Sequence, residues 1–159
     1  MRITNATLAY LCLLTVASLS NAKGWHGIVP LHSTRADVER LLGPSTDPTK
    51  GHASIHKTKN EVVLVVYASG PPCGTDARSM WQVPRGTVVS LTVASRREQQ
   101  VTDLPIDITS YEKIEDGHLP GITRYINEEE GISIEVDKDK VTDISYFASA
   151  KDKYLRCPK

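Results

Sequence analysis

Residues 131–147, GISIEVDKDKVTDISYF, contain the pattern that decides the fold. Apolar and polar residues alternate from Gly131 to Val136, as they do in a strand that buries one face. The charged residues 137–140 interrupt this pattern, and a second run follows from Val141 to Phe147. Two such runs around a short polar turn predict an antiparallel β-hairpin.

A second strong strand signal lies earlier in the chain, between Glu61 and Ala68. It contains an unbroken and mostly β-branched apolar run from Val62 to Tyr67. Such a run is typical of a central strand that is covered on both faces. We therefore expect Leu64, in the middle of the run, to be buried.

Weaker alternation predicts several further strands. Val89, Leu91 and Val93 recur at every second position between Gly86 and Ser95, so we expect them on one face of a strand. Three other segments have strand-like composition: Ile122 to Asn127, the surroundings of Ile55, and residues 104–114, which fit a helical turn equally well.

One helix is predicted, from Ser33 to Gly43. Thr34 and Asp37 have the spacing of a capping box, and a glycine–proline pair ends the helix. Its apolar stripe, which we expect to pack over the sheet, consists of Val38, Leu41 and Leu42. One short helix and many antiparallel strands predict a strand-rich α+β fold in two layers, with the helix packed on the sheet.

The first 22 residues have the features of a secretory signal. A basic residue follows the initiator methionine, an apolar run extends from Ala6 to Leu19, and the small residues Ser20 and Ala22 precede the expected cleavage point. Polar residues interrupt the run, which makes it too short for a membrane-spanning helix. We expect cleavage between Ala22 and Lys23, and a single exported domain, periplasmic or secreted, from residue 23 to residue 159.

The overall charge narrows the choice of partners. The chain has 19 basic and 19 acidic residues, whereas nucleic acids and anionic lipids select for basic surfaces. We therefore expect no nucleic-acid partner. We see no second long apolar segment, so the mature chain is expected to be soluble, without a transmembrane segment. A protein partner in the cell envelope is compatible with this composition.

The cysteines divide between the signal and the mature chain. Cys12 lies in the signal, and Leu11 before it is too large for a lipoprotein cleavage motif. Cys73 and Cys157 remain, and an even pair in an oxidising compartment predicts a disulfide. The bond would connect the polar C-terminal tail to the Pro-Pro-Cys-Gly loop. A reactive thiol at Cys73 is the alternative.

Other chemically interesting residues have simpler explanations. His52 and His56 would lie roughly 13 Å apart on a strand, too far to share one ion. Asp137, Asp139 and Asp143 lack the glycine and the glutamate of a calcium loop. We expect the histidines, including His26 and His32, and the run Glu128 to Glu130 to be solvated, and the two tryptophans to be half-buried. We assign no catalytic residue, no cofactor and no metal site.

Two resemblances accompany these predictions. The segment Thr34 to Gly43, a capped helix followed by strands, resembles the start of the small BamE/SmpA-type envelope domains. Those are two-layer α+β interaction scaffolds. Three other segments resemble a set of exported bacterial proteins without an assigned activity: Gly24 to Leu31, Asn127 to Ile132, and Lys151 to Lys153. The resemblances imply export and this fold class, and they imply no catalytic residues.

The sequence therefore favours an exported soluble protein that binds or scaffolds other molecules. The alternative is a small secreted hydrolase whose site uses Cys73 or the histidines. An enzyme would bring such side chains together in a concave site. A scaffold would present an open sheet face or edge with apolar residues.

Overall fold

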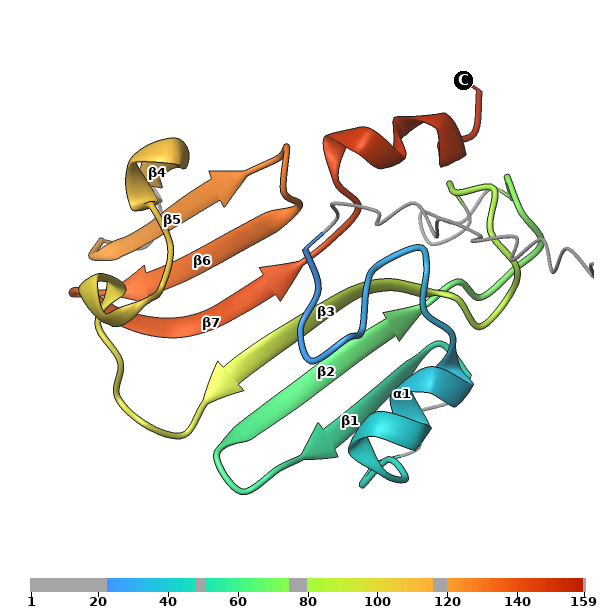
Figure 1. Ribbon diagram of the computed structural model, residues 1–159, viewed down its shortest axis with the longest axis horizontal. Coiled ribbons are helices and arrows are strands. Elements are labelled where there is room, and N and C mark those ends of the chain that lie inside the picture. Colours follow the sequence, from blue (N-terminus) through green and yellow to red (C-terminus); the bar gives the residue numbers. More distant parts are fainter. Residues whose placement is uncertain (1–22, 48–50, 75–79, 116–119, 159) are drawn as a thin grey trace, which may run out of the picture.

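The computed structural model describes residues 23–47, 51–74, 80–115 and 120–158. These residues form a seven-stranded sheet in the order β1-β2-β3-β7-β6-β5-β4, and every neighbouring pair is antiparallel (Figure 1). A strand-rich antiparallel sheet with one α-helix agrees with the predicted fold class. The strands are β1 (Ala53–Lys57), β2 (Glu61–Tyr67), β3 (Val88–Ser95), β4 (Glu112–Glu115), β5 (Ile122–Asn127), β6 (Ile132–Asp137) and β7 (Lys140–Tyr146).

Two meanders meet at the centre of the sheet. The first runs through β1, β2 and β3, and the second runs from β4 to β7. The segment between them carries two 3-10 helices, η2 (Val101–Asp103) and η3 (Ile108–Ser110). It leads to β4 at the far edge, so the second meander returns toward the centre and β7 pairs with β3. Residues 104–114 thus contain both structures that the sequence left open, a helical turn and a strand.

One face of the sheet carries two apolar cores. The first core joins β2 and β3 to Ile28 of the N-terminal segment and Val38 of the helix α1 (Arg35–Leu42). The second core joins β6 and β7 to Tyr111 and to the 3-10 segment before it. Tyr146 packs against both cores, so this side chain connects the two halves of the protein.

The helix begins where the sequence predicts. The Thr34 side chain accepts a hydrogen bond from the Asp37 backbone, and the Asp37 carboxylate accepts from the Thr34 backbone at 2.9 Å. Val38 is fully buried and Leu42 packs at the edge of the first core. Leu41 is 43 % exposed, so its expected place over the sheet is wrong. Of the predicted apolar stripe of this eight-residue helix, only Val38 and Leu42 take part in the first core.

Strand β2 is buried on one face and not on both. Val63, Val65 and Tyr67 are fully buried, whereas Leu64 is 40 % exposed. The prediction that Leu64 is a core residue is therefore wrong. The residues packed against β2 in the first core, Ile28 and Val38, lie on the opposite face of the sheet, and Val62 and Val66, on the same face as Leu64, are half-buried.

Strand β3 contains an irregularity that alternation alone cannot reveal. Val66 pairs with Ser90, but Tyr67 pairs with Val88, so β3 has one extra residue at this point. Leu91 and Val93 face the first core as predicted. Val89 does not join them, because the extra residue turns it toward a third cluster with Leu31.

The hairpin of β6 and β7 agrees closely with its prediction. Ile132, Ile134 and Val136 are buried, and the turn consists of Lys138 and Asp139. Both turn residues have positive φ angles, 49° and 72°, as a two-residue hairpin turn of the type I′ class requires.

Candidate binding site beside the disulfide

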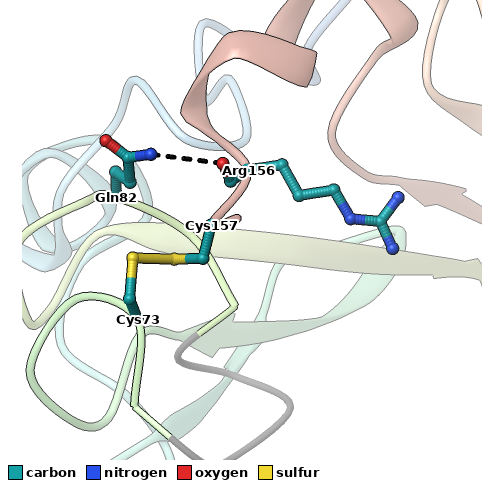
Figure 2. The surroundings of a disulfide bond; sticks show 4 residues. All are labelled: Cys73, Gln82, Arg156 and Cys157. Atoms are coloured by element: carbon teal, nitrogen blue, oxygen red, sulfur yellow. Dashed lines mark hydrogen bonds between the residues drawn. A yellow bond between two sulfur atoms is a disulfide. The ribbon is translucent and has the colours of Figure 1, made fainter. Parts of the chain in front are cut away.

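The disulfide fixes the C-terminal tail against the loop that precedes β3. Cys73 and Cys157 are bonded, with their Cα atoms 5.4 Å apart and a separation of 84 positions in sequence (Figure 2). The predicted pair is therefore present in the structure. Cys73 lies in an exposed loop, as expected, but its sulfur is engaged in the bond and is not a free nucleophile in this state.

Backbone contacts extend this attachment beyond the sulfur atoms. The Cys157 amide donates to the Met80 carbonyl at 2.9 Å, and the Gln82 amide donates to the Leu155 carbonyl at 2.7 Å. The Gln82 side chain donates to the Arg156 carbonyl at 3.2 Å, as Figure 2 shows. The tail is thus paired along residues 155–157 with the segment 80–82.

A hollow of about 380 Å³ lies next to this attachment, where β3 begins and β7 has ended. We call it the tail hollow. Ligand pockets typically have volumes of about 300 to 1,000 Å³. The residues that line it are Met80, Trp81, Val89, Ser90, Glu128, Phe147, Ala148, Ser149, Ala150, Lys153 and Arg156.

The lining combines apolar walls with charged residues at the rim. Trp81 and Phe147 are half-buried, and Met80 is 43 % exposed. Lys153 and Arg156 are exposed, and Figure 2 shows the Arg156 side chain extending away from the disulfide. Two cations against one carboxylate give this rim a positive balance. An apolar group that carries a negative charge is the ligand class that fits such a site.

The 3-10 helix η4 (Ala150–Leu155) supplies one wall, and Asp152 holds its first turn. Asp152 is 3 % exposed. Its carboxylate accepts hydrogen bonds from the Ser149 hydroxyl at 2.7 Å and the Ser149 amide at 3.0 Å. His32 Nε2 lies 2.9 Å from the other oxygen, which connects this turn to the N-terminal segment.

Hydrogen bonding controls the charge state of Asp152. Burial by itself would raise the pKa of this carboxyl, but the hydrogen bonds from Ser149 and His32 outweigh burial and lower the pKa. Asp37, the corresponding residue of the α1 capping box, has its pKa lowered to about 2, first by the Thr34 backbone and then by Arg40 and the Thr34 side chain. Both carboxyls are therefore ionised at neutral pH.

We expect Asp152→Ala to lower the free energy of unfolding by about 2 kcal/mol at pH 7, because the buried donors on Ser149 lose an ionised acceptor. A lowered native pKa stabilises the folded state above the ordinary pKa and loses this effect as pH falls through the native value. The difference between variant and wild type should therefore shrink below about pH 4. Urea unfolding at pH 7 and pH 3 measures both quantities.

Asp37→Ala is the matched control, because Asp37 caps α1 in the same way at a more exposed position. Its loss should be smaller than that of Asp152→Ala. Equal losses at pH 7 would contradict the larger role of the buried carboxylate, and a loss for Asp152→Ala that does not change with pH would contradict a role of its charge.

The structure separates the histidines from one another, and one prediction about them is wrong. His56 is 1 % exposed, not solvated. Its Nε2 atom lies 2.9 Å from the Ser54 hydroxyl, which is 2.7 Å from the Tyr67 hydroxyl. Burial lowers the pKa of His56, so the imidazole is neutral at pH 7. The α1 side of the sheet thus buries a hydrogen-bonded polar chain, and the guanidinium of Arg35 stacks 4.0 Å above the Tyr67 ring.

The other sequence candidates lie in separate places. His52 and His26 are exposed, and the His26 ring contacts the half-buried Trp25 edge-on. Glu128 and Glu129 are exposed as expected, whereas Glu130 pairs with Lys23 at 2.7 Å. Within the described ranges, no three metal-ligating side chains are grouped, and no helix is long and apolar enough to cross a membrane. The predicted signal, with cleavage after Ala22, lies outside the described residues.

Comparisons with protein-family models, with curated proteins and with solved structures gave no match to this chain. The tail hollow was not predicted from the sequence, although two signals for its walls are present. Ser149 and Asp152 have capping-box spacing, which predicts the turn of η4. The predicted disulfide, in turn, places residues 155–157 beside the loop that contains Trp81.

Proposed function

We propose that this chain is an exported soluble binding protein, and that the tail hollow is its binding site. The observation that supports this function is the hollow itself, where apolar walls from Trp81 and Phe147 meet a rim that carries Lys153 and Arg156. Concave sites with mostly apolar walls and a few polar groups are typical of ligand pockets. The proposed ligand is an apolar group that carries a negative charge, because Lys153 and Arg156 outnumber Glu128 in the lining.

Export rests on two independent arguments. The first 22 residues have the composition of a secretory signal. A disulfide between Cys73 and Cys157 persists in oxidising compartments, and the structure holds these residues in that geometry. The site of action is the periplasm or the extracellular space, and the ligand is presented there by a partner protein or in free form.

The two-layer arrangement belongs to the same proposal. Val38 of α1 is fully buried with Val63 and Val65 of β2, which supports a helix layer over one part of the sheet. The helix layer does not extend to the end of the sheet near Trp81, where the tail lies instead. Attachment of the tail by the disulfide then serves binding, because Lys153 and Arg156 of the tail line the hollow.

The hydrolase alternative has less support. It needs a thiolate at Cys73 or a group of histidines around a reacting atom. The sulfur of Cys73 is bonded, His56 is buried beneath α1 with Ser54, and His32 is held by Asp152. These positions favour structural roles for the residues that the alternative would use.

Calorimetric titration of the purified exported protein with octanoate tests the proposed function. We expect one octanoate per chain, and weaker binding of the neutral 1-octanol. In the variant with Lys153→Gln and Arg156→Gln, octanoate affinity should fall about fivefold, which corresponds to roughly 1 kcal/mol for two exposed charges.

Lys151→Gln is the matched control. Lys151 is an exposed lysine in the same 3-10 helix but does not line the hollow. Its substitution should leave octanoate affinity unchanged. If octanoate does not bind, or if the control variant loses as much affinity as the double variant, the tail hollow is not an anion-binding site.

A further inference from the structure

A second hollow, of about 360 Å³, lies on the core-bearing face of the sheet, and we call it the inner hollow. Its floor includes Ile144 of β7, and its walls come from the two segments that cover this face. Trp25 belongs to the N-terminal segment, and Leu104 and Pro105 belong to the segment after η2. The inner hollow therefore lies at the gap between the covers of the first and second cores. Pro105 is exposed, so the hollow opens to solvent.

Two aromatic side chains line this hollow and are held in place. The backbone of Trp25 exchanges two hydrogen bonds with Ile28, at 3.0 and 2.9 Å, and Ile28 is fully buried in the first core. Tyr146 lies at the end of β7 and packs against both cores. Both rings are half-buried, so each keeps part of its surface available to a ligand.

One carboxylate completes the lining. Glu61, the first residue of β2, is the one charged side chain among the described residues of this hollow. The Thr58 hydroxyl donates to Glu61 Oε2 at 3.0 Å, and this contact orients the carboxylate. Burial, and then the charge of Glu61, raises the pKa of Tyr146, so the phenol is neutral at pH 7. The Glu61 carboxylate and this neutral phenol line the same hollow.

Aromatic rings and a carboxylate around an apolar space favour a particular class of ligand. The negative face of an indole or phenol ring attracts cations, above all weakly hydrated organic ones. A negative carboxylate adds to this attraction and disfavours an anion. We propose that the inner hollow binds an organic ammonium group, with its alkyl substituents against Leu104, Pro105 and Ile144 and its charge facing Glu61, Trp25 and Tyr146.

This inference is independent of the proposed function, because the two hollows differ in place and in charge. The tail hollow has Trp81 in its wall and two cations at its rim, whereas the inner hollow has Trp25 and Glu61. The chain has two tryptophans, one in each lining. Their indole N–H signals therefore report the two hollows separately in one nitrogen–proton correlation spectrum, and Trp25→Phe assigns them.

Titration with choline tests the proposal, and the uncharged carbon analogue 3,3-dimethylbutan-1-ol is the reference ligand. Choline should shift the Trp25 indole signal and leave the Trp81 signal in place. Its affinity should exceed that of the uncharged analogue by about tenfold, the combined effect of the aromatic faces and the carboxylate. This comparison uses the unmodified protein, so it does not depend on the folding of any variant.

Glu61→Gln should reduce choline affinity about threefold, because it removes the contribution of the carboxylate and leaves that of the two aromatic rings. Glu112→Gln is the matched control, since Glu112 is an exposed carboxylate on the edge strand β4, and it should change nothing. Equal affinity for choline and its uncharged analogue would overturn the proposal. So would an unchanged affinity in folded Glu61→Gln, or a shift confined to Trp81.

The same ammonium group occurs free and in lipid headgroups, and sedimentation with phosphatidylcholine vesicles separates these sources. Free choline binding without sedimentation indicates a small soluble amine. If the protein sediments with the vesicles and added choline prevents this, the ligand is a lipid headgroup, and this result also supports the proposal. Absence of both overturns it.

Discussion

Replacing both cysteines, Cys73→Ser together with Cys157→Ser, is expected to lower the free energy of unfolding by about 4.5 kcal/mol. The bond connects residues 84 apart in sequence, and in the chain-entropy model a ring of this length strongly restricts the unfolded chain. The tail supplies little burial of its own, since Lys153, Tyr154 and Arg156 are exposed. The loss should therefore not be offset by packing, and urea unfolding measures it.

Reduction of the unmodified protein is the control for this prediction. Dithiothreitol should lower its stability by the same amount and should have no effect on the doubly substituted variant. Thiol titration of the unfolded, unreduced mature protein should find no free thiol. Two free thiols would show that the bond is absent from the protein, and Cys73 would again be a candidate nucleophile.

The second large effect is expected at Leu91. This side chain is fully buried in the first core with Val65 and Tyr67, so Leu91→Ala leaves a cavity and should cost about 3.5 kcal/mol. Leu64→Ala is the matched control on the neighbouring strand. Leu64 is 40 % exposed on the opposite face, and its truncation should cost about 0.5 kcal/mol or less.

The difference between these two leucines tests which face of the sheet is covered. Equal losses would mean that something covers the face with Leu64, such as a second copy of the chain. In that case the loss at Leu64 should depend on protein concentration. Chemical denaturation at two concentrations distinguishes the possibilities.

Local patterns predicted the elements whose structure depends on nearby residues. The hairpin of β6 and β7 follows from alternation around a charged turn, and α1 follows from its capping box. The strand Ile122–Asn127 has the predicted bounds. In each case the residues that determine the element lie within it or directly beside it.

Predictions failed where distant segments decide the outcome. Whether Leu64 is buried depends on which face receives α1 and the N-terminal segment, and the apolar run from Val62 to Tyr67 carries no information about this. Val89 turns away from the first core because β3 accommodates an extra residue opposite β2. His56 is buried because Ser54 and Tyr67 supply a hydrogen-bonded chain beneath α1.

The candidate sites show the same division. The expected oxidising compartment and the even number of cysteines in the mature chain predicted the bond between Cys73 and Cys157. This prediction did not require knowledge of the fold. The two hollows require the fold, because the residues around each come from segments far apart in the chain. Trp81 and Phe147, for example, line the same hollow, which depends on β7 returning to pair with β3.

The central claim is that the tail hollow binds an apolar anion. The most direct test is a nitrogen–proton correlation spectrum of the purified exported protein during titration with octanoate. We predict that the Trp81 indole signal moves to a saturating shift while the Trp25 signal stays in place. Movement of the Trp25 signal alone, or no movement of either signal at saturating octanoate, would contradict it.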